Sequence, residues 1–89
     1  MKIRQHMKIS GWVQGVGFRY RARYAASQLG LTGWVRNEWD GTVEMEVQGS
    51  AEEINKMFAM IGQSPYIRIE NIERKEIPLE EHETGFHVR

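Results

Sequence analysis

The chain has 89 residues, 40% of them hydrophobic, and its 12 basic residues balance its 12 acidic ones to give a formal net charge of zero. This length predicts a single domain, residues 1–89, with a modest core, and the balanced charge is unlike that of a protein that binds duplex nucleic acid. The absence of cysteine excludes disulfides, thiolate catalysis and cysteine zinc sites.

The first part of the chain predicts a strand, a helix and a second strand. Apolar residues alternate along residues 2–13, which indicates a strand with one buried face. Residues 20–29 contain no glycine or proline and carry small apolar residues at helical spacing, so they predict a helix that packs closely on a sheet. Gly30 is typical of the residue just after a helix, and residues 31–36 predict the second strand.

A hairpin and a second helix follow. The Asp40-Gly41 pair is a strong hairpin signal, and residues 42–48 alternate apolar and polar side chains as a half-buried strand does. Ser50 and Glu53 have the spacing of a capping box. Apolar residues then recur at the spacing of an amphipathic helix up to residue 61.

The last part of the chain predicts a strand, a loop and a short final strand. Residues 66–77 keep the alternation of a strand, but its phase shifts between Ile69 and Ile72, which predicts a bulge or a bend there. Residues 78–85 are acidic and polar and predict a solvated loop, and residues 86–89 predict a short last strand.

The order of these elements defines the expected fold. A β-α-β-β-α-β order with a short fifth strand predicts an α+β, ferredoxin-like sandwich, with an antiparallel sheet of four to five strands and two helices on one face. We find no internal repeat or linker.

The sequence predicts neither a membrane span nor a signal peptide. The apolar runs are all far shorter than the roughly 20 residues of a membrane span. The basic residues after Met1 are not followed by the apolar stretch of a signal peptide. We therefore expect a cytoplasmic protein that makes no contact with a membrane.

The stretch from Gly11 to Arg19 is the candidate functional segment. It holds three glycines, Gly11, Gly15 and Gly17, just before the predicted helix. Backbone N–H groups can converge in such a turn and at a helix start to bind an anion, and an arginine side chain suits phosphate oxygens. The pattern indicates a phosphate cradle, although a purely structural strand-to-helix turn fits the same residues.

The expected topology gives Arg19 a partner. The strands before and after the first helix should be parallel and should end at the same edge of the sheet, which brings Asn37 to the rim that holds Arg19. An amide can both accept from and donate to a water molecule. The alternative is that Asn37 only starts the hairpin turn, a common role for asparagine.

Three collinear motifs carry a resemblance to a known family. Residues 13–19 (VQGVGFR), 29–37 (LGLTGWVRN) and 40–44 (DGTVE) closely resemble the acylphosphatases. The resemblance covers essentially the whole chain. It implies a ferredoxin-like fold and hydrolysis of acyl phosphates to a carboxylate and inorganic phosphate.

The resemblance also implies roles for single residues. The arginine matching Arg19 binds the phosphate, and the asparagine matching Asn37 positions the attacking water. Trp12 departs from the family, many members of which carry a basic residue there. The cradle loop, which holds the phosphate with backbone N–H groups, consists of Gln14, Gly15, Val16, Gly17, Phe18 and Arg19.

The chemistry needs few groups beyond these. An acyl phosphate has a good leaving group, so the catalytic task is positioning and charge stabilisation. We expect no metal and no other cofactor, with the bound phosphate itself accepting the water's proton. The expected partners are a small-molecule acyl phosphate and inorganic phosphate, the latter as product and inhibitor, and we expect a monomer that binds no nucleic acid. The remaining titratable residues read as structural; His6, His82 and His87 share no metal-ligand spacing.

Two other function classes remain open. A non-catalytic domain that senses phosphate or an acyl phosphate could use the same cradle, because a fold does not fix a function. Ferredoxin-like domains also include RNA-binding modules that stack bases on aromatic residues of the sheet. Trp12, Trp34 and Trp39 could lie exposed near one rim and serve that purpose, although the third strand lacks the aromatic RNA-binding motif.

Overall fold

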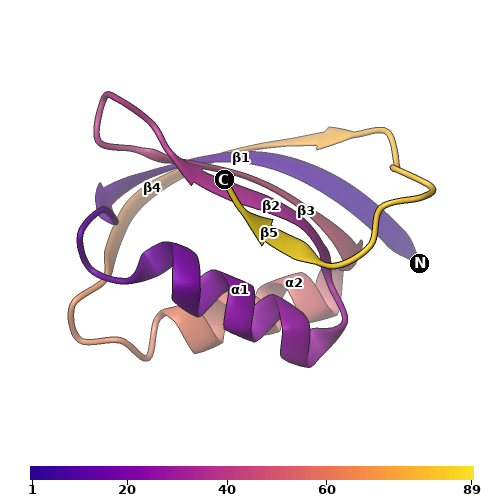
Figure 1. The fold of residues 1–89 in the computed structure, drawn as a ribbon, viewed down its shortest axis with the longest axis horizontal. Helices are drawn as coiled ribbons and strands as arrows, with labels where there is room; N and C mark the ends of the chain where they lie inside the picture. Colours follow the sequence, from indigo (N-terminus) through magenta and orange to yellow (C-terminus); the bar gives the residue numbers. More distant parts are fainter.

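The computed structural model describes residues 1–89 and consists of two layers, a five-stranded sheet and a pair of helices. Both helices cover the same face of the sheet, as expected for a ferredoxin-like sandwich (Figure 1). The elements are β1 (Lys2–Trp12), α1 (Phe18–Leu29), β2 (Thr32–Asn37), β3 (Val43–Ser50), α2 (Ala51–Ile61), β4 (Arg68–Ile77) and β5 (Phe86–Val88).

The sheet has the strand order β4-β1-β3-β2-β5. β3 lies between β1 and β2 and is antiparallel to both, so β1 and β2 run parallel and end at the same edge, as the sequence predicts. β5 pairs parallel to β2, and the sheet is therefore mixed rather than entirely antiparallel. The cause is the segment after β4, which crosses the end of the sheet and brings the chain back beside β2 (Figure 1).

α2 begins with the cap that its sequence predicts. The Ser50 hydroxyl oxygen accepts a hydrogen bond from the Glu53 backbone N–H at 3.1 Å, and the hydroxyl donates to the Glu53 carboxylate at 3.1 Å. Such a cap stabilises a helix by about 1 kcal/mol. α1 begins two residues before the predicted start and has no equivalent side-chain cap.

The predicted bulge in β4 is present. Ser10 pairs with Asn71, whereas Gly11 pairs with Ile69, so Glu70 is an extra residue between them. Gly11 lies so close to β4 here that a Cβ would collide with the carbonyl group of Arg68. The role of Gly11 is thus to let β1 and β4 approach at the bulge.

The core fills the space between the sheet and the helices. It comprises 17 buried residues from every element except β4. The Phe18 side chain is 1% exposed and anchors the first turn of α1 in this core. The small residues Ala22, Ala25 and Ala26 are fully buried, which lets α1 lie close to its neighbours.

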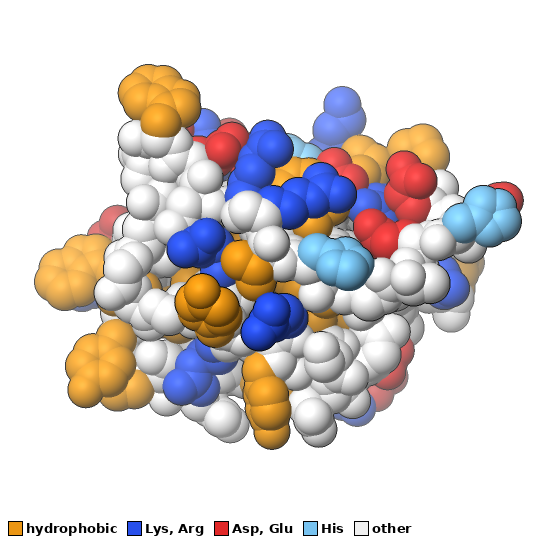
Figure 2. Space-filling view, in the orientation of Figure 1, with side chains coloured by type: hydrophobic (Ala, Val, Ile, Leu, Met, Phe, Trp, Pro, Cys, Tyr) orange, Lys and Arg blue, Asp and Glu red, His pale blue; other side chains and the backbone are white.

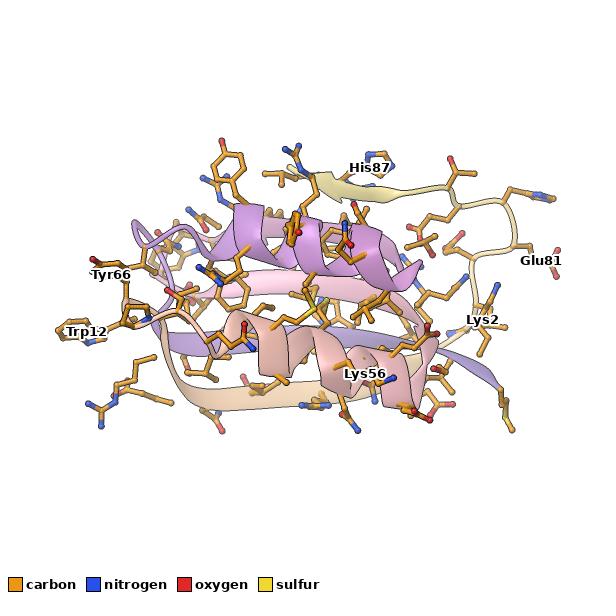
Figure 3. All side chains as sticks on the ribbon, turned by 90° about the horizontal axis from the view of Figure 1, so that it is seen from below. Lys2, Trp12, Lys56, Tyr66, Glu81 and His87 are labelled. Atoms are coloured by element: carbon orange, nitrogen blue, oxygen red, sulfur yellow. The ribbon has the colours of Figure 1, made fainter.

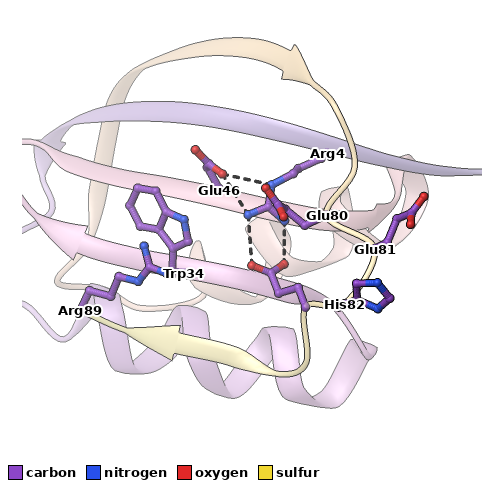
Figure 4. Close-up of a pocket in the computed structure, with 8 residues that line it drawn as sticks. Arg4, Trp34, Glu46, Glu80, Glu81, His82 and Arg89 are labelled. Atoms are coloured by element: carbon purple, nitrogen blue, oxygen red, sulfur yellow. Dashed lines mark hydrogen bonds and ion pairs between the residues drawn. The ribbon is translucent and has the colours of Figure 1, made fainter.

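The acidic segment 78–85 is a loop that is exposed except at Glu83, as the sequence predicts, but side-chain contacts tie it to the sheet. Arg4, which is 2% exposed on the outer face of the sheet, forms ion pairs with Glu83 at 2.6 Å and with Glu46 at 2.9 Å (Figure 4). The Gln48 side chain also exchanges two hydrogen bonds with the backbone of Glu80. These contacts hold residues 78–85 against the sheet and so place β5 beside β2.

The ion pair between Arg4 and Glu83 makes stability depend on pH. Partial burial raises the pKa of Glu83, but the hydrogen bonds and charge of Arg4, a hydrogen bond from Thr32 and the charge of Arg89 together outweigh burial and lower it below its ordinary value of 4.5. The stabilisation is therefore complete above pH 4.5 and is lost as the pH falls through the lowered pKa.

We expect Glu83→Gln to lose about 1–3 kcal/mol of unfolding free energy near neutral pH, because Arg4 keeps its burial and loses a charged partner. Its further loss on acidification to about pH 3 should be smaller than that of the parent chain, because the titrating group is gone. Urea unfolding at both pH values measures this, with Glu81→Gln, an exposed neighbour, as the control. Identical pH dependence in the two variants would contradict the assignment.

Candidate functional site: the loop between β1 and α1

Several strand ends meet at one end of the sheet. β1 ends at Trp12 and β2 ends at Asn37, and the starts of β3 and β4 lie at the same end because they pair antiparallel with β1. Residues 13–17 leave β1 there and lead into α1 (Figure 1). The topology thus places this loop between β2 and β4.

The loop ends at a helix N-terminus with no side-chain cap. Gly15 and Gly17 have φ angles of +72° and +81°, a left-handed conformation that favours glycine. Gly17 is the N-cap residue, so no side chain bonds the first N–H groups of α1, and the first turn contains no acidic residue. Unpaired N–H groups and the positive end of the helix dipole make such a terminus suited to an anion.

A cavity of about 150 Å³ lies at this terminus. Its walls combine the loop, the first turn of α1 and the end of β2, and the lining residues are Val13, Gly15, Gly17, Phe18, Arg19, Tyr20 and Asn37. Arg19 is the only charged group among them. The cavity therefore carries a net positive charge.

Arg19 has no carboxylate within ion-pair distance, in contrast to Lys8 of β1 and Arg36 of β2. Lys8 pairs with Asp40 at 3.4 Å. Arg36, next to Asn37 in the sequence, pairs with Glu44 at 2.6 Å and with Glu38 at 3.3 Å. The guanidinium of Arg19 is thus the charge that remains available to an anion in this cavity.

Asn37 brings an unpartnered polar atom to the same cavity. Its Oδ1 is buried and has no hydrogen-bond partner in the protein, and a buried polar atom without a partner is destabilising. The hairpin turn does not use the Asn37 side chain, because Asp40 accepts hydrogen bonds from the Thr42 amide at 3.1 Å and from its hydroxyl at 2.6 Å. The Asn37 side chain thus lines the same cavity as Arg19, and its Oδ1 accepts no hydrogen bond from the protein.

The Gln14 side chain is directed at the hairpin instead of the cavity. Its Nε2 donates to the carbonyl oxygens of Glu38 at 2.7 Å and Thr42 at 2.8 Å. Two strong hydrogen bonds of this kind fix the loop relative to the turn that follows Asn37. Gln14 is thus suited to positioning the loop, and its side-chain donors are already used.

The predicted cradle residues do not all line the cavity. Gly15, Gly17, Phe18 and Arg19 do, although the buried Phe18 side chain leaves only its backbone for a ligand. Val16 lies against a neighbouring groove. Tyr20 lines the cavity and was not singled out from the sequence, although its position in the first turn of α1 was the available signal.

A larger cavity, of about 530 Å³, lies on the outer face of the sheet (Figure 4). Four glutamates and two arginines line it, and one of these, Arg4, already bonds two of the glutamates. This charge disfavours a phosphate there. The protein has no group of three histidine or acidic residues placed to hold a metal ion, and none of its helices is long and apolar enough to cross a membrane.

The fold and the smaller cavity together define a small α+β domain with a positively charged cavity at the start of its first helix. Comparison with known proteins shows to which family within this class the chain belongs. The acylphosphatase family model matches residues 5–88. An acylphosphatase of Clostridium acetobutylicum is 39% identical over 99% of this chain and 98% of its own length. One from Thermococcus kodakarensis is 40% identical over 98% and 96%.

The structural comparison agrees with the sequence comparison. The crystal structure of acylphosphatase from Bacillus subtilis superimposes with a TM-score of 0.86 at 30% identity and covers 98% of both chains. This chain belongs to the acylphosphatase family. The resemblance drawn from the three motifs is confirmed, and so is the enzyme class, with hydrolysis of acyl phosphates as the activity that the family supports.

We expect Gln14→Ala to fold and to lower kcat/KM for an acyl phosphate at least about tenfold, because a loop displaced by a fraction of an ångström misaligns the reacting groups. It should also lower the free energy of unfolding by about 1–2 kcal/mol through the two lost hydrogen bonds. Steady-state kinetics and urea unfolding measure both effects. Gln28→Ala, on the exposed side of α1, is the matched control, and equal activity of the two variants would refute the positioning role.

Proposed function

We propose that the cavity at the start of α1 is where this acylphosphatase hydrolyses its substrate, with Arg19 and the loop binding the phosphoryl group and Asn37 orienting the water. One observation carries the proposal. An unpaired guanidinium, an uncapped helix N-terminus and the unpartnered Oδ1 of Asn37 line one cavity of about 150 Å³. A phosphoryl group needs donors and positive charge, and an attacking water needs an acceptor.

The binding of the phosphoryl group rests on backbone and guanidinium donors. The N–H groups of the loop and of the first turn of α1 are the donors expected to face its oxygens. Arg19 adds a charged fork that can hold two oxygens at once. These groups are held before the substrate arrives, and preorganised donors stabilise the charge that develops in the transition state.

Asn37 supplies the acceptor for the nucleophile. A water that donates one proton to Oδ1 is held with a lone pair free to attack phosphorus. Fixing a water in this way removes much of the entropic barrier to attack. The rigid position of Asn37, at the end of β2 and beside the hairpin that Gln14 bonds, supports such a role.

The reaction balances without a protein base. The water oxygen forms a bond to phosphorus while the bond from phosphorus to the acyl oxygen breaks, and its electron pair leaves with the carboxylate. The second proton of the water passes to a phosphate oxygen. A dianionic acyl phosphate and water thus give a carboxylate and a dihydrogen phosphate ion. Neither a metal nor a histidine is required.

The proposal also covers inhibition by the product, the oligomeric state, the location and the partners of the protein. Inorganic phosphate should inhibit as well as leave as product, because the same cradle binds it. Action as a monomer and as a single domain of residues 1–89 is also part of the proposal. A cytoplasmic location and the absence of nucleic-acid binding complete it. Trp34 is buried in the sheet, and the guanidinium of Arg89 lies 4.8 Å from its ring centre (Figure 4). The Arg36 guanidinium lies 5.1 Å from the same ring centre, so Trp34 offers no free ring to a base.

Phosphate sensing without catalysis is the competing function that the same cradle would allow. Such a domain needs Arg19 and the helix N-terminus, but it has no use for an acceptor aimed at a water. The unpartnered Oδ1 of Asn37 favours the hydrolase. The two functions are distinguished by two variants, one that weakens phosphate binding and one that lowers only the turnover of an acyl phosphate.

We expect Arg19→Ala to lower kcat/KM for benzoyl phosphate by at least about 100-fold, because a charged donor to the transition state is lost. The inhibition constant of inorganic phosphate should rise at least about tenfold with it, since the same guanidinium binds the product. Asn37→Ala should lower kcat by about 100-fold while the phosphate inhibition constant stays within about twofold, because only the water loses its partner.

Arg74→Ala on β4 and Asn55→Ala on α2 are the matched controls, since neither residue lines the cavity. Both should retain the activity of the parent chain. Full activity of Asn37→Ala would refute the assignment of the water-orienting group. A parent chain that binds phosphate and turns over no acyl phosphate would favour the sensor.

A further inference from the structure

A second groove opens beside the phosphate cavity. It has a volume of about 490 Å³. It is lined by Val16, Gly17, Tyr20, Arg21, Tyr24, Ser64 and Tyr66. Gly17 and Tyr20 also line the smaller cavity, so the two spaces adjoin each other at the start of α1. Nothing in the roles assigned so far uses this groove.

The groove gathers all three tyrosines of the chain. Tyr20, Tyr24 and Tyr66 are 61%, 63% and 72% exposed. Tyr20 and Tyr24 are four residues apart on α1 and therefore lie on the same face of the helix, while Tyr66 comes from the segment between α2 and β4. Exposed aromatic side chains grouped in this way mark a binding surface, and hydrophobic side chains project at this end of the molecule in Figure 2.

The walls of the groove are held in place by neighbouring groups. The Ser64 side chain is nearly buried, and its hydroxyl oxygen accepts a hydrogen bond from the Tyr66 backbone N–H at 3.3 Å. The Arg23 guanidinium lies 5.7 Å from the centre of the Tyr20 ring. Arg21, within the groove, has no carboxylate partner. The backbone at Tyr66 is thus fixed, and the rings lie next to two arginines, Arg21 and Arg23, that have no carboxylate partner.

The groove lies on the opposite side of the loop from Asn37. Trp12, the last residue of β1, pairs with Arg68 of β4, and Tyr66 precedes Arg68 by two residues. Trp12 and Tyr66 accordingly appear at the same end of the molecule in Figure 3. In the sheet order β4-β1-β3-β2, the loop after β1 therefore separates Tyr66 from the end of β2, which carries Asn37.

The geometry of in-line displacement at phosphorus determines where the acyl group of the substrate points. The attacking water and the leaving oxygen lie on opposite sides of the phosphorus atom. If the water is held on the Asn37 side, the acyl group points away from β2, toward the groove. The substrate's acyl part thus reaches the tyrosines without a change in the loop.

We propose that this tyrosine groove binds the acyl part of the substrate and that it favours planar, aromatic acyl groups over small aliphatic ones. The inference rests on the proposed function, because it takes the phosphate position from it. Tyrosine rings stack with a planar ring or contact it edge to face, and the Arg21 guanidinium can stack on it as well. The charge of Arg21 also disfavours cationic acyl groups and favours the carboxylate product.

The test compares benzoyl phosphate with acetyl phosphate. The ratio of their kcat/KM values is measured for the parent chain, Tyr24→Ala, Tyr66→Ala and the double variant. The intrinsic reactivities of the two substrates cancel when ratios are compared between variants. Tyr24→Phe and Tyr66→Phe keep the ring without the hydroxyl, and Leu79→Ala, an exposed apolar residue of the segment after β4, is the control.

Each alanine variant should lower the benzoyl-to-acetyl ratio roughly fivefold, and each phenylalanine variant should restore it, because the ring face makes the contact. Leu79→Ala should keep the parent ratio. An unchanged ratio in the double variant, with both substrates hydrolysed by the parent chain, would overturn the groove assignment and leave the proposed function intact. A parent chain that hydrolyses neither substrate would instead overturn the proposed function and this inference with it.

Discussion

The N-terminus of α1 has no side-chain cap, and the site depends on this. Ser50 caps α2 with its hydroxyl oxygen, whereas Gly17 at the equivalent position of α1 has no side chain to do so. Glycine in place of a capping side chain costs only a few tenths of a kcal/mol, roughly, of stability, and it leaves the first N–H groups free to donate to the oxygens of a bound phosphate. The burial of Phe18 in the core fixes the direction of these groups, so the donors are aligned before the ligand arrives.

The strand order of the sheet determines which residues lie opposite the N-terminus of α1. Since β3 separates β1 from β2, the loop after β1 and the side chain of Asn37 lie at one rim, and Gln14 bridges them through the carbonyl oxygens of the hairpin. Lys8 and Arg36 are each paired with a carboxylate, while Arg19 is not. One side of the loop thus holds a free acceptor and the other holds exposed tyrosine rings, an arrangement that suits attack and departure on opposite faces of phosphorus.

The fold was largely predictable because local signals and topology agreed. The capping pair at Ser50 and the phase shift in β4 are both present where the sequence places them. Contacts between residues distant in the chain were not predictable. Arg4 and Glu83 are 79 positions apart, and their ion pair holds the acidic loop against the sheet. Likewise the glycines and Arg19 were visible as a motif, while the engagement of the Gln14 side chain depends on carbonyl groups 24 and 28 residues away.

The central claim is that the loop and Arg19 form the phosphate site, and titration with inorganic phosphate followed by ¹⁵N NMR tests it most directly. The account predicts that the largest amide shift changes fall at residues 15–20, together with the side-chain amide of Asn37, and that they vanish in Arg19→Ala. The largest changes around Arg4 and Arg89, in the larger cavity on the outer face of the sheet, would contradict it.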